Sequence, residues 1–139
     1  MGRSRYKIYE PTHPHFITCT VLNWIPLFTR KESVEILLES FKHLQQTDDF
    51  KLYAYVILEQ LAFYKKAHKE DRTYQVWQEG LQPKLIQTDA MMISKINYIQ
   101  HNPVKRGYVD EAVHWRYSSA RDYEGKSGLL EVECFCSLD

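Results

Sequence analysis

The stretch SKINYIQHNPVKRGYV, residues Ser94–Val109, joins a tyrosine, an Asn-Pro pair and two cations in one short segment. Helical spacing of apolar residues leads into it, and Thr88 or Asp89 supplies a side chain of the kind that caps a helix at its first turn. Proline is disfavoured inside a helix, and it also disfavours the helical conformation of the residue that precedes it. The sequence therefore predicts a helix that begins near residue 88 and ends at Asn102-Pro103.

Tyr98 lies away from the apolar stripe of this predicted helix. At about 100° per residue, its side chain points roughly 130° from the centre of that stripe, beside Met91 and Lys95. The stripe consists of Met92, Ile96 and Ile99. Two interpretations stay open at this point, because tyrosines often pack with a half-buried ring and a wet hydroxyl, and this chain has ten of them. Tyr98 is either such a packing residue or an exposed nucleophile.

Outward from this helix, the chain alternates between strand-like and helix-like segments. β-branched and aromatic residues predict strands, whereas recurrence of apolar residues at helical spacing predicts helices. We expect strands at His15–Leu22 and Lys51–Leu58 with a weaker one at Thr73–Gly80, and helices at Thr29–Gln46 and from Glu59 to Glu70. The helix at Thr29–Gln46 carries the stripe Val34, Leu37, Leu38, Phe41 and Leu44. This order indicates a mixed α and β domain.

Composition favours one globular domain over residues 1–139. The chain is 44% hydrophobic with few glycines and prolines, and its formal net charge is zero, so any nucleic-acid surface must come from locally clustered cations. We expect a basic N-terminal arm at residues 1–14 and an acidic tail at residues 124–139. Three cysteines without metal-type spacing, no signal peptide and no long apolar span predict a cytoplasmic protein without a membrane segment.

Five separated blocks of the sequence resemble the REP-associated tyrosine transposases, which are relatives of the single-tyrosine HUH transposases. The blocks occur in the family's order and reach to about Tyr123. They are PHFITCTVLNWIPLFTR, FKLYAYVILE, YQVWQEG, KINYIQHNPVKRGYV and HWRYSSARDY. The combination of the tyrosine, Asn-Pro and Trp-Arg-Tyr-Ser-Ser blocks is more specific than any one of them.

The resemblance implies a ferredoxin-like α+β fold, an antiparallel sheet with helices packed on one face. It also implies a homodimer that acts on single-stranded or hairpin DNA in the transposition of mobile elements. Intact relatives cut and rejoin DNA strands through a tyrosine that becomes linked to the 5′ phosphate, and Tyr98 holds that position here. The bond energy is retained in this intermediate, so rejoining needs no ATP.

The sequence departs from the family pattern where a metal is bound. Intact relatives hold Mg²⁺ or Mn²⁺ with a His-hydrophobic-His pair on a central strand, because residues i and i+2 of a strand share a face. In this chain Leu58 and Glu59 run directly into Gln60, and the pair is missing. An internal deletion of one central strand and one helix accounts for this. We therefore expect no bound metal here and cleavage that is impaired or absent.

Three histidines are alternative metal ligands. His13 and His15 are separated by one residue, but that residue is Pro14, which lacks the N–H that a central strand position needs. His101 follows Tyr98 by three residues and lies on a neighbouring helical face. Solvated or packed histidines remain the simpler interpretation for all three.

The remaining predicted contacts with DNA follow Tyr98. Five residues combine cations with one aromatic ring, which suits phosphates and unpaired bases: Lys105, Arg106, Trp115, Arg116 and Arg121. Core packing of Trp115 under the stem of Arg116 is the alternative. Two functions stay open: a transposase that still cleaves with substitute ligands, and a catalytically dead DNA-binding remnant or non-functional product.

Overall fold

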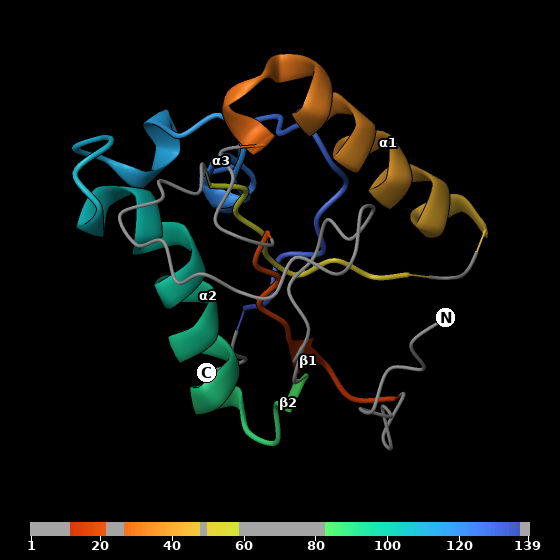
Figure 1. Cartoon of the computed structure of the whole chain (residues 1–139). Helices are drawn as coiled ribbons and strands as arrows, with labels where there is room; N and C mark the ends of the chain where they lie inside the picture. The colour runs from red at the N-terminus through yellow and green to blue at the C-terminus, as the bar shows by residue number, and fades with distance from the viewer. Residues whose placement is uncertain (1–11, 22–26, 48–49, 59–82, 137–139) are drawn as a thin grey trace, which may run out of the picture.

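The computed structural model describes residues 12–21, 27–47, 50–58 and 83–136, which form an α+β arrangement (Figure 1). Two short strands, β1 (His15–Phe16) and β2 (Lys84–Leu85), pair antiparallel with Phe16 opposite Lys84. The long helices are α1 (Lys31–Thr47) and α2 (Asp89–Lys105), and the short elements are η2 (Leu27–Thr29), η3 (Ala112–His114) and α3 (Ala120–Tyr123). The structure confirms the α+β class. The ferredoxin-like sheet and the loss of a strand and a helix stay predictions.

Several predictions fall outside the described residues. They are most of the basic arm (residues 1–11), the helix from Glu59 to Glu70, the strand at Thr73–Gly80, and the junction after Leu58 where a deletion is expected. Of the strand predicted at His15–Leu22, the structure shows β1 at its start and a bridge residue at Val21.

The predicted helix at Thr29–Gln46 is confirmed as α1, and its apolar stripe faces the core. Val34 and Leu38 are buried, and Leu37 and Phe41 pack half-buried against the same cluster. Leu44, the last member of the predicted stripe, is 36% exposed. The contact of α1 with the core therefore weakens near its C-terminal end.

The predicted start of α2 is also confirmed. Thr88 is the N-cap residue, and its Oγ1 accepts a hydrogen bond of 3.2 Å from the backbone N–H of Met91. Such a bond satisfies one of the donors that a helix start leaves without an intrahelical partner. Met92 and Ile96 are buried beneath the helix. The apolar stripe predicted from the sequence thus identifies the side of α2 that is buried.

The predicted end of α2 at Asn102-Pro103 is wrong, because Pro103 lies inside the helix. Proline's missing N–H removes a single bond in the last turn, and the helix continues to Lys105. It ends where Gly107 takes a φ of +78°, with its N–H bonded to Val104 O at 2.9 Å and the Tyr108 N–H bonded to Pro103 O at 3.0 Å. These two bonds form a Schellman motif, which satisfies carbonyls left free at a helix end. The left-handed glycine, and not the proline, ends α2.

The strand predicted at Lys51–Leu58 is not a regular strand. The segment pairs with residues 117–119 at one isolated antiparallel bridge, between Val56 and Ser118. The Ile57 N–H donates to Tyr117 O at 2.8 Å, and the Ser119 N–H donates to Tyr55 O at 3.0 Å. Because the partner segment turns into α3 immediately afterwards, the ladder cannot extend on that side.

Two apolar clusters lie on either side of residues 50–58, which run between the long helices (Figure 1). The cluster beside α1 contains Val34, Leu38, Tyr55, Ile57 and Leu130. The cluster beside α2 contains Ile86, Met92 and Ile96, with Phe16, Tyr53, Ala54, Tyr123 and Phe135 packed against it. Burial of this apolar surface is the main term that holds the two helices to the central segment.

The acidic segment 124–136 contributes to both clusters. Leu130 is buried in the cluster beside α1, and Phe135 packs against the cluster beside α2. The Tyr123 hydroxyl donates to Tyr53 O at 2.7 Å and accepts from the Phe135 N–H at 3.1 Å. This hydroxyl and the Glu133 N–H, which donates to Leu52 O at 2.9 Å, therefore tie the end of the described chain to the central segment.

Candidate nucleic-acid surface

Tyr98 lies on the solvent side of α2, with 53% of its surface exposed. The face of α2 opposite to the buried Met92 and Ile96 carries it, as the helical phase predicts. Its ring meets the Phe16 ring edge-on, with centroids 5.9 Å apart and planes at 74°. Edge-to-face contacts of this kind are favourable between aromatic quadrupoles. Tyr98 is thus not a core residue, and its ring is held against β1.

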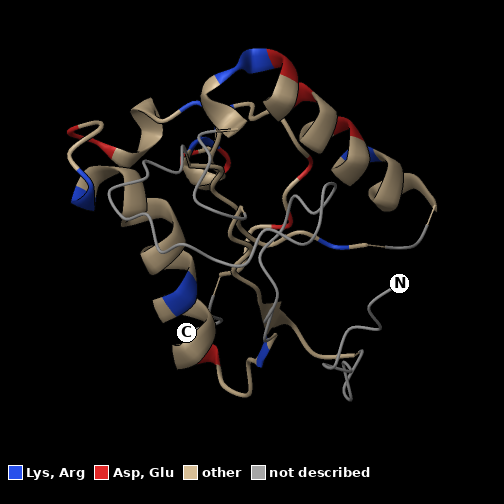
Figure 2. Cartoon of the chain, in the orientation of Figure 1, with Lys and Arg blue, Asp and Glu red and all other residues tan. Residues whose placement is uncertain are grey.

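Cations lie before and after Tyr98 along the same face of α2. Lys95, Tyr98, Asn102 and Arg106 are spaced by three or four residues, which places them on one side of a helix, and Lys105 lies next to them. The Arg106 Nε donates to Asn102 Oδ1 at 2.9 Å. Figure 2 shows cations at two places on α2 and acid only at its first residue. From Lys95 to Arg106 the helix rises about 16 Å. We call these five residues the α2 face.

Lys95 belongs to the site, although sequence analysis assigned it no role. Its Nζ lies 4.7 Å from the centroid of the Phe16 ring, and it is half-buried. This is a cation–π contact, in which the ammonium is attracted to the negative face of the ring. The sequence did place Lys95 beside Tyr98 by helical phase. It could not show that both contact Phe16, because that contact depends on how β1 packs against α2.

Trp115 and Arg121, two predicted DNA contacts, make hydrogen bonds within the fold. The Trp115 Nε1–H donates to Ile57 O at 3.0 Å, and its ring stacks on Tyr108 with centroids 5.3 Å apart. The Arg121 Nε–H donates to Val113 O at 3.1 Å. Arg116 and Lys105 are exposed. The predicted DNA contacts thus divide into side chains that support the fold and side chains that point to solvent.

The three histidines considered as metal ligands do not gather at Tyr98. Adjacent strand residues point to opposite faces, so His15 lies on the other side of β1 from Phe16. His13 and His101 are exposed, and the Thr12 Oγ1 lies 3.2 Å from His13 Nδ1. Within the described parts of the chain, no three side chains of His, Cys, Asp or Glu come together as metal ligands would. The described residues therefore do not fit a metal site beside the tyrosine.

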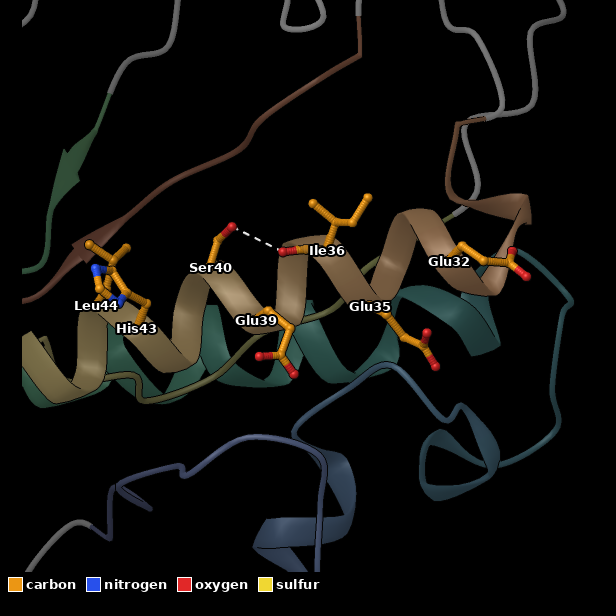
Figure 3. Close-up of a pocket in the computed structure, with 7 residues that line it drawn as sticks. All are labelled: Glu32, Glu35, Ile36, Glu39, Ser40, His43 and Leu44. Atoms are coloured by element: carbon orange, nitrogen blue, oxygen red, sulfur yellow. Dashed lines mark hydrogen bonds between the residues drawn. The ribbon is translucent and has the colours of Figure 1, made fainter.

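An open hollow of about 800 Å³ lies over the outer face of α1 (Figure 3). Ile36, which is 70% exposed, and Leu44 give it apolar patches, and the Ser40 hydroxyl donates to Ile36 O at 3.0 Å. Its charged lining consists of Glu32, Glu35 and Glu39, together with His43. Carboxylates repel a phosphate backbone, so this hollow has the wrong charge for nucleic acid.

Two titratable groups at the contact between the central segment and α3, Tyr55 and Asp122, have raised pKa values. Burial, and then the charge of Asp122, raises the pKa of Tyr55 to about 12. Burial also raises the pKa of Asp122, against the hydrogen bond that its carboxylate accepts from the Gly128 backbone. The Tyr55 hydroxyl lies near the Leu129 backbone without completing a hydrogen bond. These shifts concern the stability of the fold.

A partial match links the chain to a Haemophilus influenzae protein that is named a REP-associated tyrosine transposase. The two are 36% identical over 56 residues, which make up 40% of this chain. The match spans 32% of that protein's length, or about a third of it. No protein-family model and no solved structure matches the chain. Among the described residues, no helix is long and apolar enough to cross a membrane. The match supports a likeness to this transposase family over part of the chain.

Proposed function

We propose that this protein is a member of the REP-associated tyrosine transposase family that binds single-stranded or hairpin DNA through the α2 face. The observation that carries the proposal is the exposed Tyr98 with cations on both sides along one helix. Cations bind the phosphate backbone, and an exposed aromatic ring can stack on an unpaired base. The partial likeness to a transposase supports the same assignment. The ferredoxin-like fold and the homodimer belong to this proposal.

In an intact relative the tyrosine hydroxyl attacks a DNA phosphorus. A bond forms between the tyrosine oxygen and phosphorus, the bond to the 3′ oxygen breaks, and the freed 3′ hydroxyl takes up a proton. A phenol with an ordinary pKa of about 10 is a weak nucleophile at neutral pH, so the phosphate must be polarised. Divalent metal supplies that polarisation in intact relatives.

We propose that cleavage by this chain is impaired or absent. The His-hydrophobic-His pair is missing after Leu58, where the resemblance expects it, and the described residues gather no ligand set at Tyr98. Loss of several kcal/mol of transition-state stabilisation slows a reaction by several orders of magnitude. The proposed activity is therefore DNA binding. A relic that no longer binds DNA is the alternative.

Fluorescence anisotropy with a labelled DNA hairpin that carries a single-stranded extension tests binding. The variant Lys105→Gln plus Arg106→Gln loses two charges from the α2 face, and Lys31→Gln plus Lys42→Gln loses two from α1 as the matched control. We expect the α2 variant to bind at least about tenfold more weakly at 0.1 M salt, and the α1 variant to bind like the unmodified chain. Equal effects from both variants, or no binding by the unmodified chain, would refute the proposal.

A denaturing gel tests cleavage separately. The hairpin is incubated with the protein in Mg²⁺ or Mn²⁺, and a slower band marks a covalent adduct. We expect no adduct with either the unmodified chain or Tyr98→Phe. An adduct that appears with metal and disappears in Tyr98→Phe would show that cleavage survives, and His13, His15 and His101 would then be the first ligands to test.

A further inference from the structure

The ring of Phe16 contacts two groups of the α2 face. One is the Lys95 ammonium, 4.7 Å from the ring centroid, and the other is the Tyr98 ring, 5.9 Å from it. Lys95 and Tyr98 are three residues apart, so their side chains leave α2 on the same side. Within the described residues, no carboxylate forms an ion pair with Lys95. Among the described residues, the charge of Lys95 therefore lies beside the tyrosine without an ion-pair partner.

A second cation approaches from β2. Lys84 lies directly opposite Phe16 in the β1–β2 pair, and directly opposed residues project from the same face of a sheet. Ile86, two residues further on, is buried in the cluster beside α2 together with Phe16, which confirms that this face looks toward α2. Lys84 is exposed and is the first residue of β2. By its register, Lys84 projects from the face of the β1–β2 pair that carries Phe16.

We infer that Lys95 and Lys84 form a phosphate subsite next to Tyr98, with Phe16 as its platform. The ligand is one backbone phosphate of a single DNA strand, whose neighbouring base can stack on the exposed part of the Tyr98 ring. This inference rests on the proposed DNA binding and names the part of the site that receives the phosphate nearest to the tyrosine. Lys105 and Arg106, one helical segment away, bind other phosphates of the strand.

The Phe16 platform matters because it restrains Lys95 before DNA arrives. A free lysine loses side-chain entropy when it is fixed on a ligand. Lys95 already has its stem half-buried and its ammonium drawn to the ring, so less freedom remains to be lost on binding. Lys95 is accordingly the residue that binds the phosphate, and Phe16 is a positioning residue that acts through Lys95.

The first test pairs Lys95→Gln with a DNA strand in which single phosphates are replaced, one position at a time, by uncharged methylphosphonate. We expect Lys95→Gln to weaken binding by about fivefold to tenfold and to lower the slope of log K against log salt by about 0.7. At one position the combined loss of affinity should be smaller than the product of the two separate losses, because Lys95 and that phosphate contact each other. At every other position the two losses should be independent and their fold-changes should multiply. Lys84→Gln should couple to the same phosphate, and Lys42→Gln on α1, the matched control, to none.

A second variant, Phe16→Leu, separates the charge of Lys95 from the restraint that the Phe16 ring places on it. Phe16→Leu keeps an apolar side chain in the cluster but removes the ring face, so binding should weaken by about threefold with the salt slope unchanged. Multiplicative effects of Lys95→Gln at every phosphate, or coupling to different phosphates for Lys95 and Lys84, would overturn the subsite while DNA binding stands. Failure of the unmodified chain to bind the strand would overturn the proposed function and the subsite with it.

Discussion

Two tyrosines, one in each apolar cluster, predict opposite results for the same substitution. The Tyr123 hydroxyl makes two hydrogen bonds, to Tyr53 O at 2.7 Å and from the Phe135 N–H at 3.1 Å. The Tyr55 hydroxyl is buried and completes none with the described residues. Tyr→Phe removes the oxygen and keeps the ring in both cases. The difference between the two variants therefore isolates what the hydrogen bonds contribute.

Tyr123→Phe should lower the free energy of unfolding by about 2 kcal/mol, at about 1 kcal/mol for each lost hydrogen bond. For a chain of this length the melting temperature should fall by about 8 °C. Tyr55→Phe should raise the free energy of unfolding by about 1 kcal/mol, because a buried hydroxyl without a partner loses its bonds to water on folding and gains none in return.

Urea denaturation followed by tryptophan fluorescence measures both variants against the unmodified chain. Equal m-values would show that the midpoint shift reports stability and not a change in the unfolded state. A loss in Tyr55→Phe as large as in Tyr123→Phe would refute the reasoning, since it would mean that the Tyr55 hydroxyl is bonded. Tyr117→Phe in the cluster beside α1 serves as a ring-preserving control.

Three further predictions concern the ends of α2 and the effect of alkaline pH. Gly107→Ala should lower the free energy of unfolding by about 1 to 2 kcal/mol in urea denaturation, because a φ of +78° strains any residue with a Cβ. A steric clash does not contribute, since nothing lies within 4 Å of the added Cβ. An unchanged urea midpoint would contradict the Schellman motif at the end of α2. Thr88→Ala should cost about 1 kcal/mol in the same assay through loss of the N-cap bond, whereas Thr88→Ser should cost little. Since the pKa of Tyr55 rises from 10.0 to about 12 on folding, its contribution to stability is complete below pH 10 and is lost as pH climbs toward 12. Unfolding free energies measured at pH 9 and pH 11 should therefore differ less in Tyr55→Phe than in the unmodified chain.

The helices could be predicted from sequence because their signals are local. The stripe that includes Val34 and Leu38 fixed the buried side of α1, and Thr88 fixed the start of α2. The end of α2 was missed because Asn102-Pro103 is a strong local signal for a helix boundary, whereas proline in a last turn loses one bond only. Gly107 carried the correct signal four residues later, since glycine is the usual residue just past a helix end.

Pairing between distant segments could not be predicted in the same way. The composition of Lys51–Leu58 suits a strand, but a strand needs a partner, and here the partner is residues 117–119, which leave at once for α3. β-propensity describes how a side chain fits a pleated, half-buried surface and not whether a ladder will form. The sequence therefore predicts that Lys51–Leu58 is extended, but it cannot predict how many of its residues pair in a sheet.

The candidate site shows the same division. The exposure of Tyr98 follows from helical phase alone. The hydrogen bonds from Trp115 to Ile57 and from Arg121 to Val113, in contrast, depend on contacts between separate segments. From sequence alone both are predicted DNA contacts, because aromatic and cationic residues have the same appearance in a binding surface and in a supporting one. Only the location of their hydrogen bonds tells the two roles apart.

These hydrogen bonds shift the expected DNA surface from the Trp-Arg-Tyr block to α2. The indole N–H is the only donor of Trp115, so Trp115 must break its bond to Ile57 O before it can donate to DNA, which costs about as much as the new contact returns. Lys95 and Lys105 have no such bond among the described residues, and Lys95 is also restrained by Phe16. Binding energy should therefore concentrate on α2, and Arg121→Gln should lower stability more than it lowers DNA affinity. Lys105→Gln should do the reverse, so measuring both quantities in both variants decides whether the binding surface is α2 or the Trp-Arg-Tyr block.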